Sequence, residues 1–327
     1  MSFTSIVKTE VSKIIALKQE NIAELSAIVH NNEKTLEYIR IYTENSSVAR
    51  KVYTLFKDLY NEIPKITVRK GYNYNKNLIY ILEITNNVSD ILNSLGIMQN
   101  NEISPIPESF IIDDIDTLRA YLRGTFLSSG SVNDPKKSRY HLEFLFDNEL
   151  YSQFIVDKLN EFFLNCKYIK RDSKYMVYIK EAEKIGDFLR IINASNAVMY
   201  YEDIRIYRDH KNMTNRLNNM EQANVDKIVN AASKQDKDIE VIKEFGGLDL
   251  LDDKAKVVAE YRIKYPEVSL QELSEIISYE TNSPISKSGI NHRIKKIQLL
   301  AEKLKAADIK KYLFLFLRKK IKKILKV

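Results

Sequence analysis

Residue types suited to contacting nucleic acid are concentrated near the C-terminal end of the 327-residue chain, between positions 286 and 304. Four apolar residues recur there at helical spacing: Ile290, Ile294, Ile297 and Leu304. They define the inward face of a helix, so the polar residues between them must point outward. Ser288, His292 and Lys295 lie on that outer face, and Lys287, Asn291 and Lys296 flank it. Ser and Asn can hydrogen-bond base edges, whereas Lys287, Arg293 and Lys296 suit phosphates.

A second, shorter helix is expected just before this one. Ser269-Leu270-Gln271-Glu272 has the pattern of a capping box, which would start a helix that runs through Ile277. Pro284 lies in the following turn and prevents that helix from continuing. Ser286 or Ser288 then caps the next helix. Two helices joined in this way predict a helix-turn-helix whose second helix reads bases through its N-terminal part, Lys287–Lys295.

The predicted interface with double-stranded DNA consists of both capping regions and the outer face of the second helix. Its ten residues are Ser269, Glu272, Ser286, Lys287, Ser288, Asn291, His292, Arg293, Lys295 and Lys296. A helical hairpin with a solvated polar face would show the same pattern.

The charge distribution favours an anionic partner. Residues 286–327 contain fourteen Lys and Arg against only Glu302 and Asp308, although the whole chain has a net charge of +7. Such a basic end on a mildly acidic body is typical of proteins that contact nucleic acid or an anionic membrane. In residues 306–327 an apolar run is followed by a basic stretch, which predicts a basic amphipathic tail. That tail could contact a membrane surface or DNA phosphates, or could pack on the body of the protein.

Composition argues against other kinds of site. Cys166 is the single cysteine, so we expect it to be a core residue and exclude a disulfide framework or a multi-cysteine zinc site. The four histidines are dispersed, and no glycine-rich phosphate-binding loop occurs. We therefore expect no metal, no cofactor and no small-molecule substrate. The N-terminus lacks the features of a signal peptide, which predicts a cytoplasmic protein.

The first two thirds of the chain contain an internal repeat. In each copy a helix, a strand, a second helix, two strands and a third helix follow one another. The first copy has 20–30, 35–43, 46–60, 65–70, 78–84 and 88–95, and the second has 116–128, 138–146, 149–165, 167–171, 175–180 and 181–192. Beyond about residue 209 only helices are predicted, at 214–234, 236–245, 252–265 and the pair within 269–304.

Two motifs resemble one known family. Residues 284–297, Pro-Ile-Ser-Lys-Ser-Gly-Ile-Asn-His-Arg-Ile-Lys-Lys-Ile, resemble the C-terminal helix-turn-helix of the bacterial WhiA family. Residues 120–135, beginning Ala-Tyr-Leu-Arg-Gly-Thr-Phe-Leu-Ser-Ser-Gly, resemble the family's central motif, which is a relic of the LAGLIDADG helix of homing endonucleases. Ser2-Phe3, Thr43-Glu44-Asn45 and several stretches within 198–224 agree with the family as well.

This resemblance implies an α+β fold in which duplicated LAGLIDADG-like αββαββα units form a pseudo-twofold N-terminal region, followed by an all-α helix-turn-helix domain. It divides the chain into repeats at 1–98 and 108–210, a connecting helix at 211–235, the DNA-binding domain at 236–305 and the tail at 306–327. It also implies a nucleoid-associated regulator of transcription, linked to cell division and chromosome segregation, whose N-terminal region could bind a protein partner.

The resemblance further implies that the endonuclease-like region is not catalytic. In homing endonucleases the eighth motif position supplies a carboxylate that binds Mg²⁺. Aligning the motif on Leu122–Gly130 puts Ser129 at this position, and aligning it on Leu25–Glu33 puts Asn32 there. Asp134 is the nearest substitute, but Asn-Asp-Pro suggests a turn acid. A residual metal-dependent nuclease and a non-specific nucleoid or membrane-surface scaffold are the alternatives.

Overall fold

The computed structural model describes residues 2–71, 78–100, 102–137 and 139–324, with the side chains of the last helix described as far as Ala307. The chain forms two compact units, Met1–His210 and Lys211–Val327.

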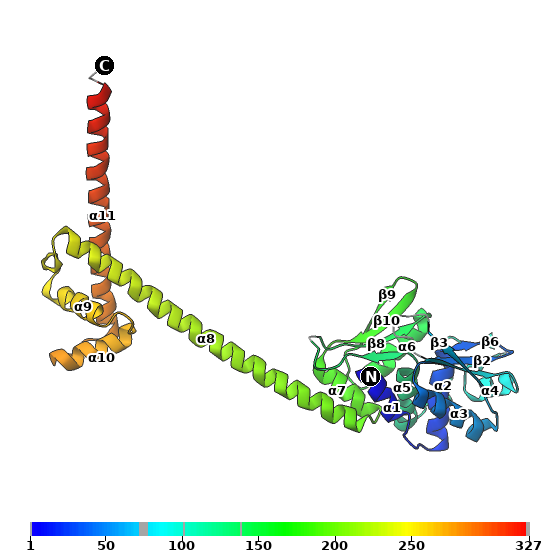
Figure 1. Cartoon of the computed structure of the whole chain (residues 1–327). Helices are drawn as coiled ribbons and strands as arrows, with labels where there is room; N and C mark the ends of the chain where they lie inside the picture. The colour runs from blue at the N-terminus through cyan, green and yellow to red at the C-terminus, as the bar shows by residue number, and fades with distance from the viewer. Residues whose placement is uncertain (1, 72–77, 101, 138, 325–327) are drawn as a thin grey trace. The chain divides into compact units, whose positions relative to one another are not determined.

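The first unit contains two copies of one αββαββα arrangement (Figure 1). The first copy comprises α2 (Lys18–His30), β1 (Glu33–Lys34), β2 (Ile39–Thr43), α3 (Ser46–Tyr60), β3 (Lys65–Lys70), β4 (Leu78–Ile84) and α4 (Val88–Ser94). The second comprises α5 (Ile115–Ser129), β7 (Gly130–Val132), β8 (Leu142–Phe146), α6 (Glu149–Asn160), β9 (Lys167–Arg171), β10 (Lys174–Ile179) and α7 (Ala182–Ile191). The strand orders β1-β2-β4-β3 and β7-β8-β10-β9 are equivalent, and every neighbouring pair is antiparallel. The expected duplicated α+β fold is therefore confirmed.

The core of this unit lies between the two sheets and their helices. Alternate strand residues such as Ile41 and Leu82 in one sheet, and Phe144 and Val177 in the other, are paired across their ladders and buried. Helices α2 and α5 pack directly against each other, and nearly all of α5 from Thr117 to Leu127 is buried. Cys166 is buried, as the sequence predicts.

Short elements of the first unit were not predicted. Helix α1 (Phe3–Val11) begins at Ser2, whose side chain accepts the backbone N–H of Ser5, and buries Phe3, Val7 and Val11. Strands β5 (Met98–Gln99) and β6 (Glu102–Ile103) form a small hairpin, and a 3₁₀ turn, η1 (Ser109–Ile112), precedes α5. The strands predicted at 35–43 and 138–146 are shorter than expected, because only Ile39–Thr43 and Leu142–Phe146 pair with β4 and β10.

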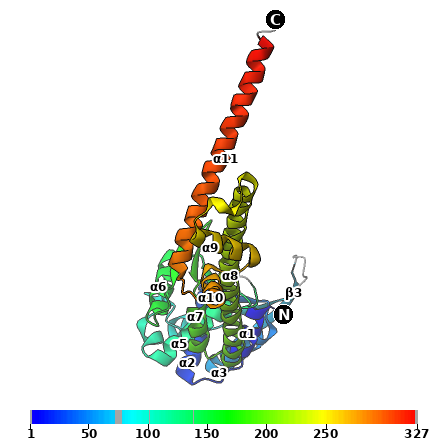
Figure 2. The same ribbon diagram turned by 90° about the vertical axis from the view of Figure 1, so that its left-hand side faces the viewer.

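As far as the structure describes it, the second unit contains helices and no strand. Helix α8 (Ser195–Phe245) enters it from the first unit and is followed by η2 (Leu248–Leu250), α9 (Asp253–Lys264), α10 (Leu270–Thr281) and α11 (Lys287–Ile324). The predicted separation of 214–234 from 236–245 is wrong, because no Gly or Pro interrupts α8 before Gly246. Figure 2 shows α9 and α10 beside the N-terminal part of α11. In the core of the second unit, Ile239 and Ile242 of α8 pack with apolar residues of α9, α10 and α11.

In the part of the chain that the structure describes, no helix combines the length and apolar character needed to cross a membrane. Helix α11 includes the start of the predicted tail, but side chains from Asp308 onward lie outside the described residues.

Candidate nucleic-acid interface

Helices α10 and α11 are joined by a tightly fixed turn. Helix α10 runs to Thr281, four residues beyond the predicted end at Ile277, and stops because Asn282 adopts the left-handed conformation with φ 49°. The Ser278 hydroxyl accepts the backbone N–H of Ile285 at 2.9 Å and donates to the Ile285 carbonyl. Ser278 therefore fixes the angle at which α11 starts, and the sequence analysis missed it.

Of the two candidate caps for α11, Ser286 has the capping contact. Its hydroxyl accepts the backbone N–H of Gly289 at 3.1 Å and lies 3.0 Å from the hydroxyl of Ser288. The Ser286 hydroxyl thus satisfies one of the backbone N–H groups that have no partner within the helix. The other N–H groups of the first turn lie at the end of α11 that is predicted to approach DNA.

The predicted division of α11 into two faces agrees with the observed burial. Ile290, Ile294 and Ile297 are at most 2% exposed, and Leu304 packs at the edge of the same core. The polar side chains Lys287, Ser288, Asn291, His292, Lys295 and Lys296 are all exposed, whereas Arg293 is half-buried. A row of hydrogen-bonding and cationic groups therefore lies along the first three turns of α11.

The two predicted site residues at the start of α10 have a local structural role. Ser269 accepts the backbone N–H of Glu272 at 3.2 Å, and the Glu272 carboxylate accepts the N–H of Ser269 at 2.7 Å, which confirms the capping box. The Ser269 N–H lowers the pKa of Glu272. Both side chains are therefore engaged by the helix end that they cap.

Two hollows flank the start of α11. One, of about 590 Å³, lies between α10 and α11 and is lined by residues that include Gln271, Ser278 and Lys287. The other, of about 400 Å³, lies between α11 and the N-terminal end of α9; its lining includes Lys254, His292 and Arg293. The exposed face of α11 is therefore a ridge between polar hollows, a shape that can enter a groove.

The hollow beside α9 contains an ion pair that the sequence analysis missed. Lys296 Nζ lies 3.0 Å from Asp252 Oδ2, and Asp252 also caps α9 by accepting the N–H of Ala255. The Lys296 ammonium, together with the Ala255 N–H, lowers the pKa of Asp252. Lys296 is therefore partly neutralised. Lys295 is exposed, and no ion pair joins it to any side chain that the structure describes.

A buried arginine supports the loop between α9 and α10. The Arg262 guanidinium, 1% exposed, donates to the carbonyls of Val268 at 2.7 Å and Tyr265 at 3.3 Å. Burial lowers the pKa of Arg262, and the charge of Asp236 opposes that effect. These hydrogen bonds hold the segment that leads into Ser269, the N-cap of α10.

In the first unit, the side chains aligned with the eighth motif position, Asn32 and Ser129, make hydrogen bonds to the backbone. The Asn32 amide donates to the carbonyl of Ile28 and its oxygen accepts the N–H of Tyr42, so it links the end of α2 to β2. The Ser129 hydroxyl donates to the carbonyl of Thr125 within α5. Neither side chain carries the negative charge that a hard cation requires.

Asp134 is a turn residue, as its Asn-Asp-Pro context predicts. Its carboxylate accepts the backbone N–H of Lys136 at 2.9 Å and is approached by the Tyr200 hydroxyl at 3.4 Å. Among the described residues, no three His, Cys, Asp or Glu side chains are grouped closely enough to hold a metal ion.

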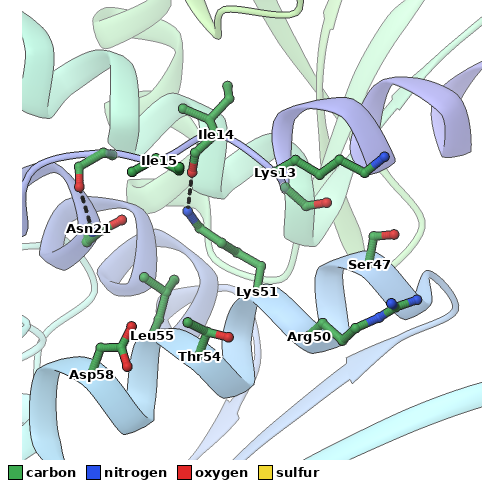
Figure 3. Close-up of a pocket in the computed structure, with 12 residues that line it drawn as sticks. Lys13, Ile14, Ile15, Asn21, Ser47, Arg50, Lys51, Thr54, Leu55 and Asp58 are labelled. Atoms are coloured by element: carbon green, nitrogen blue, oxygen red, sulfur yellow. Dashed lines mark hydrogen bonds between the residues drawn. The ribbon is translucent and has the colours of Figure 1, made fainter.

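The hollow beside α3 in the first unit has a volume of about 390 Å³ (Figure 3). It is lined by the loop after α1 and by Ser47, Arg50 and Lys51 of α3. Figure 3 shows Lys51 turned toward the backbone of Ile14, whose carbonyl accepts its Nζ at 2.8 Å. Lys51 Nζ also lies 3.8 Å from the buried carboxylate of Glu24, so the positive charge of Lys51 is paired within the protein.

These observations define the class of protein: a duplicated LAGLIDADG-like region followed by a helix-turn-helix domain. Family models agree segment by segment. The model of the WhiA N-terminal LAGLIDADG-like domain matches residues 18–98, that of the WhiA LAGLIDADG-like domain residues 118–211, and that of the WhiA C-terminal HTH domain residues 214–301. The chain belongs to the WhiA family.

Relatives match over nearly their whole length. A "Probable cell division protein WhiA" of Pediococcus pentosaceus is 42% identical over 94% of this chain and 100% of its own, and its namesake in Staphylococcus haemolyticus is 41% identical over 94% and 99%. The crystal structure of full-length DUF199/WhiA from Thermatoga maritima has a TM-score of 0.56 and 25% identity, and the match covers 93% of this chain and 99% of that one.

Proposed function

We propose that this chain is a non-catalytic DNA-binding regulator that recognises double-stranded DNA through the N-terminal part of α11. The observation that carries the proposal is the row of exposed polar side chains at Ser288, Asn291, His292 and Lys295, held outward by the buried isoleucines of the same helix. The ten predicted site residues remain the proposed interface, with Ser269 and Glu272 supporting it by capping α10. The match of residues 214–301 to a helix-turn-helix domain model supports it.

The biological role follows from the relatives. Two of them are named as probable cell division proteins, and each match covers at least 99% of the relative's own length. We therefore propose a role in cell division and chromosome segregation, exerted through transcription and located at the nucleoid. A protein partner of the N-terminal region fits this role.

The central experiment compares two substitutions on α11 against a selected target sequence and random DNA. Asn291→Ala should lower the preference for the target by about 1–3 kcal/mol, because it removes a base-edge contact. Lys287→Ala should weaken binding to both DNAs alike and reduce the steepness of the salt dependence by about one unit, because Lys287 is an exposed cation assigned to phosphates. Equal effects of both substitutions on the preference would contradict base readout by this face.

The absence of catalysis is the second part of the proposal. Asn32 and Ser129 replace the carboxylates of the endonuclease motif, and both are used in hydrogen bonds to the backbone. Supercoiled plasmid incubated with the purified chain in Mg²⁺ or Mn²⁺ should remain intact at high protein concentration. Nicking that disappears in Asp134→Asn would instead establish a residual nuclease.

A further inference from the structure

Helix α1 occupies a notch formed where α5 ends and α3 begins. The Thr4 hydroxyl accepts the N–H of Val132 at 2.9 Å and donates to the carbonyl of the same residue at 2.8 Å. On the other side, the Asn45 amide donates to the Ser5 carbonyl at 3.1 Å and to the Thr9 hydroxyl at 2.9 Å. A nine-residue helix is thus held by backbone contacts on one wall and by one asparagine amide on the other.

The duplication creates an equivalent notch at the end of α2 and the start of α6. Asn148 corresponds to Asn45, because each asparagine is the N-cap of the middle helix of its repeat, and Glu33 and Lys34 correspond to Ser131 and Val132, because they pair with equivalent positions of β2 and β8. This second notch is a hollow of about 600 Å³. Its lining includes His30, Lys34, Ser104, Leu145, Asn148 and Tyr151. All of these residues belong to the first unit.

The asparagine of the second notch presents its amide as Asn45 does. Asn148 Oδ1 accepts the backbone N–H of Tyr151 at 3.0 Å, as Asn45 Oδ1 accepts those of Ser47 and Val48. Capping fixes the oxygen toward the helix, so the NH₂ group must face away from it. Among the described residues, no atom accepts a hydrogen bond from Asn148 Nδ2.

The other polar side chains of the second notch are engaged within the described part of the chain, except that His30 Nδ1 is buried without a hydrogen-bond partner there, and the rim includes two exposed apolar side chains. Lys34 Nζ donates to the His30 carbonyl at 2.7 Å, and Lys174 lies 3.3 Å from the Asp147 carboxylate. Ile103 and Leu145 on the rim are 38% and 43% exposed. An open amide donor with apolar neighbours suits a peptide segment, whereas an ion would need uncompensated charge.

We propose that the second notch binds a short amphipathic helix of a protein partner, in the way that the first notch holds α1. The partner helix would place a backbone carbonyl and a Ser or Thr hydroxyl against the Asn148 amide, as Ser5 and Thr9 do against Asn45. Apolar residues one turn apart would cover Leu145 and Ile103. The inference concerns the first unit and does not depend on DNA binding by the second.

A labelled synthetic peptide with the sequence of residues 2–13 serves as the probe, with fluorescence anisotropy as the readout on the full chain. It should bind saturably. Asn148→Asp keeps an N-cap oxygen but removes the amide donor, and should weaken binding at least about fivefold. Leu145→Glu should weaken it further. Asn45→Asp, the matched control, acts on the notch that α1 already fills and should not weaken binding.

Thermal unfolding of each variant verifies that the first unit remains folded. The proposal is overturned if the peptide does not bind at millimolar concentration, or if Asn148→Asp binds as tightly as the wild type. It is also overturned if Asn45→Asp alone removes binding, because the peptide would then be exchanging with α1.

Discussion

Arg123 and Glu24 form a buried ion pair across the contact between the central helices of the two repeats. Arg123 Nε and Nη2 each lie 2.8 Å from Glu24 Oε2, and the two side chains are 1% and 0% exposed. Lys51 Nζ approaches the other carboxylate oxygen at 3.8 Å. Arg123 occupies the second position of the LAGLIDADG-like motif, so the helix pair that holds metal ligands in an endonuclease here contains an internal ion pair.

Removal of one member of this pair should destabilise the first unit strongly. Arg123→Met leaves the Glu24 carboxylate buried with only the distant Lys51 ammonium, and should lower the free energy of unfolding by about 3–5 kcal/mol. The double substitution Arg123→Met with Glu24→Leu removes both charges and should recover most of that loss. Urea unfolding followed by circular dichroism measures both values. Equal loss in the single and double variants would show that packing, and not an unpaired charge, is responsible.

Gly124 sets the distance between the same two helices. A Cβ built on Gly124 would overlap the backbone carbonyl of Glu24 and lie 3.0 Å from the Cβ of Ala27. Gly124→Ala must therefore push α2 and α5 apart, and should cost about 1–3 kcal/mol in urea unfolding.

Gly289 provides the matched control, because its added Cβ would have no neighbour closer than 3.4 Å. Gly289→Ala should be neutral or stabilise the second unit by up to about 1 kcal/mol, since Ala favours the helix. A similar loss of stability in both variants would mean that the backbone conformation of the helix, and not the close approach of α2 and α5, causes the effect of Gly124→Ala.

The close contact between α2 and α5 could be predicted, because the motif at 122–130 contains the small residues Gly124, Ser128 and Ser129, and small residues let two helices approach closely. The faces of α11 were predictable for a similar reason: the spacing of Ile290, Ile294 and Ile297 defines them independently of the rest of the fold. Helix-turn-helix architecture thus follows from local pattern. The ion pair between Lys296 and Asp252 does not, because the two residues are 44 positions apart.

Elements stabilised by distant contacts were missed. Helix α1 is only nine residues long, and its anchors Asn45 and Val132 are brought to it by the fold. Strands β1 and β7 have two and three residues, too few to show an alternating pattern. The break predicted between residues 234 and 236 does not exist in α8. The residues of α8 immediately before Ala232 are exposed, whereas Ala232 and Gln235 are buried, so the composition changes there although the helix continues.

His30 makes the stability of the first unit sensitive to mild acid. Its ring stacks on Tyr151 with centroids 4.3 Å apart, its Nε2 lies 2.9 Å from the Pro105 carbonyl, and burial lowers the pKa of His30 to about 3. An unfolded histidine has a pKa of about 6.5, so between these values the unfolded chain binds the extra proton. Stability should therefore fall as the pH decreases from about 6.5, by at most about 1.4 kcal/mol per pH unit from this group.

The comparison with His30→Gln isolates this contribution from the carboxylates that titrate in the same range. Gln can still donate to the Pro105 carbonyl but cannot titrate, so the variant should be less stable than wild type above pH 7 and the difference should shrink toward pH 5. Urea unfolding at pH 7.5, 6.0 and 5.0 measures it. A difference that stays constant with pH would exclude His30 as the titrating group.

The pairing of Lys296 with Asp252 predicts that Asp252 restrains DNA binding by the second unit. Asp252→Asn retains a side-chain oxygen for the Ala255 N–H, so α9 stays capped, while the Lys296 ammonium loses its counter-ion. If DNA phosphates approach this side of α11, the variant should bind random and target DNA more tightly and increase the steepness of the salt dependence by about one unit. Lys296→Ala should have the opposite effect. Binding isotherms over a range of salt concentrations measure both effects. If neither substitution changes affinity or salt dependence, DNA phosphates do not approach the hollow between α9 and α11. Lys287, which lines the hollow between α10 and α11, is then the cation left for the phosphate contact.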